Sequence, residues 1–221
     1  MISDLPGGVV FSFMRELKRP PTVFILIEDE YAFYKVGTKR LFEIAVDQAQ
    51  FSEFKPVVRV LCSKSVSIGD YDLSTSIHKI IFFEQILDIL ESLKQENEII
   101  VLHNASRPLV SKKIYNQGIK MLLQGVDAVK QKHVVVDTLK RVDHKNIVLE
   151  TVDRDLVKAI TTPEFYWTES ICGLGQEAGW FYEIENELNK DYLLGELEST
   201  RVRGEKDLFL VSALIEQGRL N

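Results

Sequence analysis

Short apolar runs rich in β-branched residues alternate along this chain with segments of helical periodicity. Parallel strands need long crossover connections, usually helices, so this alternation is typical of a mostly parallel sheet with helices on both faces. We predict four strands from the apolar runs, at Thr22–Glu28, Val57–Leu61, His78–Phe82 and Ile99–His103. The predicted fold class is therefore α/β.

Four helices are predicted between and after these strands, because apolar residues there recur with the period of a helix. Thr38 is a candidate N-cap of the first helix, the third begins at Ser111, and the fourth begins at Asp207. The apolar faces carry Leu41, Ile44, Ala45 and Ala49 in the first helix; Ile86, Ile89, Leu90 and Leu93 in the second; Ile114, Tyr115, Gly118 and Leu122 in the third; and Leu208, Val211, Leu214 and Ile215 in the fourth.

One segment departs from the α/β alternation. Two strand-like runs, residues 133–142 and 146–152, flank the turn Asp143–Asn146, which is the pattern of a β-hairpin. A lone hairpin is marginally stable and must cover its faces, so we expect a second copy of the chain to pack on it. The 221 residues fit one domain, 1–221, with a β-arm at about 133–153 and residues 1–21 as an atypical extension.

Composition excludes several functional classes. A net charge of −6 argues against nucleic-acid binding, and no stretch has the length and apolarity of a membrane span. The N-terminal residues lack the basic region and cleavage site of a signal peptide. Cys62 and Cys172 match no zinc or disulfide pattern, which is typical of a reducing compartment. We therefore expect a cytoplasmic protein.

Four short blocks between Ile99 and Tyr166 occur in a fixed order: His103-Asn-Ala-Ser-Arg-Pro108, Asp137-Thr-Leu-Lys-Arg141, Thr151-Val-Asp-Arg154 and Thr162-Pro-Glu164. In order and spacing they resemble the 2-C-methyl-D-erythritol 4-phosphate cytidylyltransferase family, and residues 200–208 resemble its C-terminal segment more loosely. The resemblance implies a Rossmann-like fold and a homodimer formed through the β-arm. It also implies cytidylyl transfer from CTP to a sugar-alcohol phosphate, with release of pyrophosphate.

The same resemblance implies two groups of functional residues. Catalytic roles fall on Arg107, Thr162 and Arg201, and binding of the acceptor phosphate falls on Thr138, Lys140 and Arg154 of the arm. An arginine suits this task because its guanidinium binds phosphate through two parallel hydrogen bonds. Two alternatives stay open. Arg154 could instead pair with Asp153 or Asp155, and Arg201 could be a solvated loop charge.

The nucleotide-binding half of the family pattern is not recognisable. The family's first strand leads into a glycine-rich loop that binds the triphosphate, whereas here the strand leads into Glu28-Asp29-Glu30. Three carboxylates would repel a triphosphate. Gly7 and Gly8 are the remaining candidates for the loop, but Phe11 and Phe13 follow where a glycine and an arginine are needed.

Asn104 stands where the family has its magnesium-binding aspartate. Because Mg²⁺ prefers anionic oxygen ligands, we predict no metal ligand here, expect Mg²⁺ only if the protein is active, and expect Asn104 to hydrogen-bond its own turn. His103 is expected to be buried and bonded by the backbone. Two functions remain open: a cytidylyltransferase of weak activity, or a catalytically silent relative that acts as a dimeric binding or regulatory protein. Transfer to another polyol phosphate, such as ribitol 5-phosphate, fits the arm motifs less well.

Overall fold

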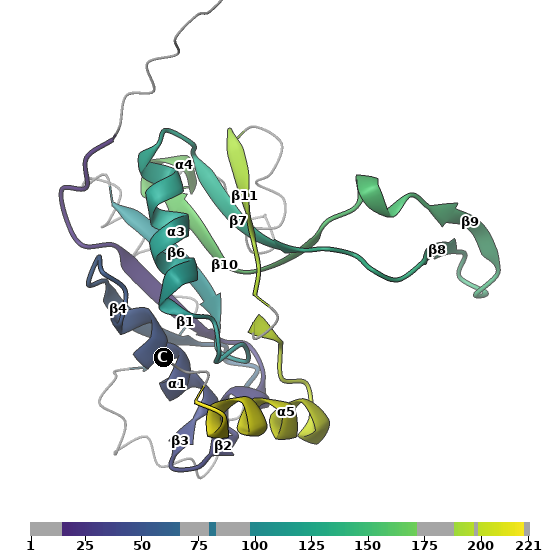
Figure 1. The fold of residues 1–221 in the computed structure, drawn as a ribbon, viewed down its shortest axis with the longest axis horizontal. Helices are drawn as coiled ribbons and strands as arrows, with labels where there is room; N and C mark the ends of the chain where they lie inside the picture. Colours follow the sequence, from purple (N-terminus) through teal and green to yellow (C-terminus); the bar gives the residue numbers. More distant parts are fainter. Residues whose placement is uncertain (1–14, 67–79, 83–97, 172–187, 197–198, 219–221) are drawn as a thin grey trace, which may run out of the picture.

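A computed structural model describes residues 15–66, 80–82, 98–171, 188–196 and 199–218. Its main sheet has seven strands in the order β11-β7-β10-β6-β1-β4-β5 (Figure 1). In this sheet only β10 runs antiparallel to its neighbours, β6 and β7. The strands are β1 Thr22–Ile27, β4 Val57–Cys62, β5 Ile80–Phe82, β6 Ile99–Asn104, β7 Ala128–His133, β10 Ala159–Trp167 and β11 Lys190–Leu194.

The four predicted strands correspond to β1, β4, β5 and β6, and the α/β fold class is confirmed. Residues 78 and 79 lie outside the described residues. Strand β1 is buried on both faces, which its continuous apolar sequence reflects. Val23, Ile25 and Ile27 point to one face, and Phe24 and Leu26 point to the other.

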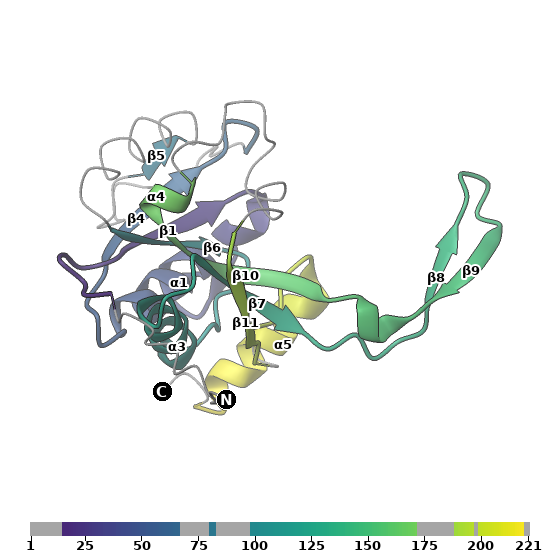
Figure 2. The same cartoon turned by 90° about the horizontal axis from the view of Figure 1, so that it is seen from above.

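The helices are α1 Leu41–Gln50, α3 Lys112–Leu123, α4 Thr168–Ile171 and α5 Glu205–Glu216, with 3₁₀ turns η1 Glu30–Phe33 and η4 Arg154–Leu156. Helices α1 and α3 cover one face of the sheet, and α4 lies on the other (Figure 2). The predicted helix over residues 86–93 lies outside the described residues. In the described residues, no helix combines the length and the apolarity that a membrane span needs.

Two predicted helix starts are wrong. Thr38 does not cap α1, because it lies in the turn between the short strands β2 Lys35–Val36 and β3 Lys39–Arg40. The N-cap is Arg40, whose backbone N–H donates to Glu43 Oε2 at 2.6 Å. Helix α5 begins at Glu205, two residues before Asp207. Val211 alone of its predicted apolar set is fully buried, while Leu208, Leu214 and Ile215 pack partly buried against the same cluster.

The hairpin projects from the body of the molecule as an arm (Figures 1 and 2). Among the described residues its strands, β8 Leu139–Val142 and β9 Val148–Val152, pair only with each other. They are shorter than the predicted runs. His133 belongs to β7 in the main sheet, and residues 134–138 connect β7 to β8 without forming a strand. Asp143 Oδ1 accepts hydrogen bonds from the N–H groups of Lys145 and Ile147, and Asn146 takes a φ of 60°, which together close the turn.

Candidate functional site

A pocket lies at the carboxyl ends of β1 and β6, the edge of an open α/β sheet where ligands usually bind. A register shift in β10 between Thr161 and Glu164 bends that strand along the same edge. The pocket is lined by Leu26, Glu28, Leu102, Asn104, Arg107, Ile160, Thr161, Thr162, Glu164 and Arg201. Arg107, Thr162 and Arg201, which the sequence assigned to catalysis, therefore line one pocket.

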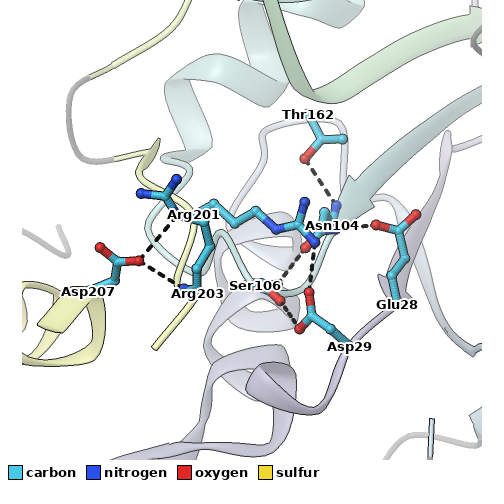
Figure 3. Close-up of polar contacts among 8 residues, drawn as sticks. All are labelled: Glu28, Asp29, Asn104, Ser106, Thr162, Arg201, Arg203 and Asp207. Atoms are coloured by element: carbon cyan, nitrogen blue, oxygen red, sulfur yellow. Dashed lines mark hydrogen bonds and ion pairs between the residues drawn. The ribbon is translucent and has the colours of Figure 1, made fainter. Parts of the chain in front are cut away.

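The turn after β6 is fixed by its own polar groups (Figure 3). Asn104 Oδ1 accepts from the Ser106 N–H at 2.8 Å, and the Asn104 N–H donates to Thr162 Oγ1 at 3.1 Å. Asn104 Nδ2 donates to Glu28 Oε2 across to the end of β1. The predicted role of Asn104 in its turn thus agrees with the geometry, which extends it to Glu28.

His103, the last residue but one of β6, holds this turn in place through hydrogen bonds of its ring. It is fully buried; Nε2 donates to the Arg107 carbonyl at 2.9 Å, and Nδ1 accepts from the Tyr115 hydroxyl of α3. Burial lowers the pKa of His103 to about 4, so the ring is neutral at pH 7. Both ring nitrogens are engaged inside the protein, which matches the expected structural role.

Each guanidinium near the pocket already has a partner within the chain. Arg107 Nη1 donates to the Ser199 carbonyl at 2.6 Å. Arg201 Nη2 lies 2.7 Å from Asp29 Oδ2, so this loop charge is ion-paired while its side chain stays 40% exposed (Figure 3). Asp29 also accepts from Ser106 Oγ at 2.6 Å, which ties the end of β1 to the turn after β6. An incoming phosphate must therefore compete with Asp29 for Arg201.

The Arg203 side chain is held next to the pocket in the same way. Its Nε lies 3.4 Å from Asp207 Oδ2, and its N–H donates to that carboxylate at 2.9 Å (Figure 3). This carboxylate belongs to the first turn of α5, where the helix dipole favours a negative charge.

Glu28 and Glu164 bring two carboxylates to the pocket wall. Burial raises the pKa of Glu28, while Arg201 and the Asn104 amide act in the opposite direction. Glu164 accepts from the Tyr166 hydroxyl and lies 3.4 Å from Lys130 Nζ, both in the sheet. From the sequence, Glu28 is expected only to repel a triphosphate. Its position directly after a buried parallel strand is the signal that indicates a pocket residue.

The three predicted phosphate-binding residues of the arm are not in the pocket of their own chain. Lys140 Nζ donates to Thr151 Oγ1 at 2.6 Å across the hairpin, and Arg154 Nη1 donates to the Val136 carbonyl at 2.8 Å. Arg154 thus bonds a backbone carbonyl rather than Asp153 or Asp155. Thr138, Lys140 and Arg154 lie on the projecting arm, outside the set of residues that lines the pocket (Figure 1).

Comparison with known proteins shows which family this chain resembles. The family model of 2-C-methyl-D-erythritol 4-phosphate cytidylyltransferase matches residues 83–182. The enzyme of that name from Alkaliphilus metalliredigens is 26% identical over 137 residues, 58% of this chain and 56% of the relative. The one from Caldanaerobacter subterraneus is 40% identical over 82 residues, 37% of this chain and 35% of the relative. In sequence, part of the chain is therefore similar to members of this family.

A solved cytidylyltransferase, from Thermus thermophilus, has the same fold. It superposes with a TM-score of 0.67 over 88% of this chain and 98% of its own, at 20% identity. The chain spans only 56% and 35% of the lengths of the two curated cytidylyltransferases in their sequence matches. The structural likeness shows the fold, and the activity is argued separately below.

The magnesium site of the cytidylyltransferase family does not fit the residues present here. Asn104 replaces the metal-binding aspartate, and its side-chain oxygen is engaged by the Ser106 N–H. No group of three potential metal-ligating side chains gathers anywhere in the described residues. Gly7 and Gly8, the candidates for the nucleotide loop, lie outside the described residues.

Proposed function

We propose that this chain is a cytidylyltransferase in which transfer from CTP to 2-C-methyl-D-erythritol 4-phosphate, with release of pyrophosphate, is slow. The observation that carries the proposal is the pocket of Arg107, Thr162 and Arg201, in which Arg201 is held by Asp29. The two guanidiniums would bind the phosphates and absorb the negative charge that develops during transfer.

Slow transfer follows from the charges around Arg201. The Asp29 carboxylate already neutralises this cation, and Glu28 adds a second negative charge on the wall. A triphosphate approaching this corner meets two carboxylates, where the family resemblance leads one to expect backbone donors. These same residues support the second candidate function, a catalytically silent member that serves as a dimeric binding or regulatory protein.

We further propose a homodimer through the arm. Thr138, Lys140 and Arg154 would then contribute to the pocket of the partner, where the family uses arm residues for the acceptor phosphate. Support comes from the apolar surface of the arm: Val134, Val136 and Leu156 are 71, 72 and 84% exposed. Exposed apolar side chains on a projecting hairpin favour coverage by another chain.

Calorimetry with the full chain tests the proposed transfer function. CTP, with and without magnesium, and 2-C-methyl-D-erythritol 4-phosphate are titrated separately, and pyrophosphate release is measured when all are combined. Asp29→Asn removes one negative charge beside Arg201, so we expect it to tighten CTP binding roughly fivefold and to raise the rate of release. Asp207→Asn, which removes a carboxylate from Arg203, is the matched control for a general change in charge.

The outcomes separate the two candidate functions. Micromolar CTP binding and measurable pyrophosphate release support slow transfer. Binding of the sugar phosphate without any CTP binding, in wild type and in Asp29→Asn alike, would leave the silent binding protein. If neither ligand binds, both functions are wrong.

A further inference from the structure

The pocket has an unusual balance of groups for a nucleotide site. Its wall combines two guanidiniums, Arg107 and Arg201, with the carboxylates of Glu28 and Glu164. Its apolar portion comes from Leu26, Leu102 and Ile160. Ionised carboxylates only accept hydrogen bonds, so they complement ligand groups that donate, such as hydroxyls. The composition therefore suits a ligand that carries phosphate, hydroxyl groups and a short carbon skeleton.

Glu28 is the more accessible of the two carboxylates, because it is exposed whereas Glu164 is buried. Its Oε2 takes a hydrogen bond from Asn104 Nδ2 (Figure 3), and among the described residues no other hydrogen bond to the Glu28 carboxylate is found. Glu164 differs, because the Tyr166 hydroxyl and Lys130 Nζ both approach its Oε2 from within the sheet. Glu28 lines the pocket and is exposed, so its Oε1 is accessible to a ligand that donates a hydrogen bond.

The Glu28 carboxylate is also held in a defined orientation. The amide that binds it belongs to Asn104, which is itself fixed by the Ser106 N–H at 2.8 Å and by Thr162 Oγ1 at 3.1 Å. Because the turn is locked before any ligand arrives, little ordering of Glu28 is needed on binding. A carboxylate oriented in this way can discriminate between ligands that do and do not offer a donor.

A metal ion is a poorer match for Glu28 than a hydroxyl group. The Asn104 oxygen faces the Ser106 N–H, so it does not join Glu28 in a ligand set. The described residues also contain no group of three metal-ligating side chains. A hydroxyl needs only one acceptor, which the exposed Glu28 carboxylate provides.

We propose that Glu28 is a specificity-determining residue that accepts a hydrogen bond from a hydroxyl group of a polyol phosphate bound in this pocket. The guanidiniums of Arg107 and Arg201 bind the phosphate of the same molecule, and the carbon skeleton packs on the apolar side chains. This inference rests on the proposed function, since it concerns the same pocket, and it adds the residue that selects the polyol.

The test compares two ligands, so that general changes in charge cancel. Dissociation constants are measured by calorimetry for 2-C-methyl-D-erythritol 4-phosphate and for inorganic phosphate, which lacks the polyol. The quantity of interest is the preference, the dissociation constant of phosphate divided by that of the polyol phosphate. We expect Glu28→Leu, which has no acceptor, to lower this preference at least tenfold. Glu28→Gln keeps a neutral acceptor and should retain an intermediate preference.

Asp29→Asn is the matched control, because it also removes one carboxylate from the end of β1. It should tighten both ligands by a similar factor and leave the preference unchanged. Thermal unfolding establishes that each variant is folded, and Glu28→Gln keeps the test decisive if Glu28→Leu does not fold.

The results distinguish failure of this inference from failure of the proposed function. If wild type prefers the polyol phosphate and both Glu28 variants keep that preference, the role of Glu28 is wrong while the pocket assignment stands. If wild type binds both ligands equally, no residue of the pocket contributes to recognition of the polyol, and the inference is overturned. If wild type binds no polyol phosphate at all, the inference and the proposed function fail together.

Discussion

His103 shows how one buried side chain holds the candidate site together. Its ring links the carbonyl of Arg107, a pocket residue, to the hydroxyl of Tyr115 on α3. Adding a proton would force Nδ1 to donate toward a hydroxyl that now donates to it, and would place a charge in a fully buried position. The physical cost of that charge appears as the lowered pKa of the ring.

This arrangement predicts a pH dependence of stability. In the unfolded chain His103 titrates near its ordinary value of 6.5, and in the folded protein near 4. Between these values the unfolded state binds more protons, so the free energy of unfolding falls as the pH drops from 6.5 towards 4. The loss from this one group is about 3 kcal/mol.

Urea unfolding of wild type and His103→Gln at a series of pH values between 4 and 7 measures this effect. Taking the difference between the two proteins cancels other titrating groups, including Glu28, whose raised pKa makes its contribution fall as the pH rises. We expect the stability advantage of wild type to shrink as the pH falls. A difference that stays constant with pH contradicts the buried neutral histidine.

At the scale of elements, helix α3 approaches the sheet closely at Gly118. A Cβ atom at this position would lie 2.4 Å from two ring carbons of Phe165, which is fully buried in β10. The glycine therefore sets how near α3 can pack to β10, the strand that also carries Thr162. The same helix carries Tyr115, so its distance from the sheet also affects His103.

Gly118→Ala is accordingly expected to destabilise the protein. Alanine is favoured over glycine in a helix interior by about 1 kcal/mol, but overpacking against a fixed ring costs about 1–3 kcal/mol, so we expect a net loss of about 1 kcal/mol. Lys113→Ala, at an exposed position of the same helix, should change the free energy of unfolding by less than about 0.5 kcal/mol.

Denaturant unfolding measures both α3 variants. Adding Phe165→Leu to Gly118→Ala should recover part of the loss, because the two positions touch and their effects are not additive. A Gly118→Ala protein more stable than wild type would show that the ring moves aside without cost.

At the scale of the whole molecule, the arm exposes an apolar surface that the rest of its own chain does not cover. Beyond the body of the protein it exposes apolar side chains along both of its strands, and among the described residues these strands pair only with each other. We predict that the chain is a dimer whose mass is about twice 25.3 kDa. Val136→Asp together with Leu156→Asp should shift it to the monomer.

Sedimentation equilibrium at micromolar concentrations measures this mass. Phe209→Asp is the control, because Phe209 is 77% exposed but lies on α5 rather than on the arm. Its mass should stay that of wild type. A wild-type mass of one chain at these concentrations would contradict the arm-mediated dimer.

The sequence by itself determined the elements and the family resemblance. The positions of β1, β4, β6, α3 and the hairpin follow from apolar periodicity and turn residues, which act over a few neighbouring positions. The four family blocks likewise lie within one stretch of chain. Thr38 was misassigned as a cap because a short pairing of Lys39 and Arg40 with β2 overrode the local preference.

Only the tertiary structure decided which charges meet. Asp29 and Arg201 are 172 positions apart, and Arg107 and Ser199 are 92 positions apart, so no local pattern reveals either contact. The order of strands brings the ends of β1 and β6 together, and that adjacency turns Glu28 and Asp29 from isolated acidic residues into pocket groups. Local sequence encodes elements through short-range sterics and burial, whereas the partner of a charge depends on which distant segments the sheet brings side by side.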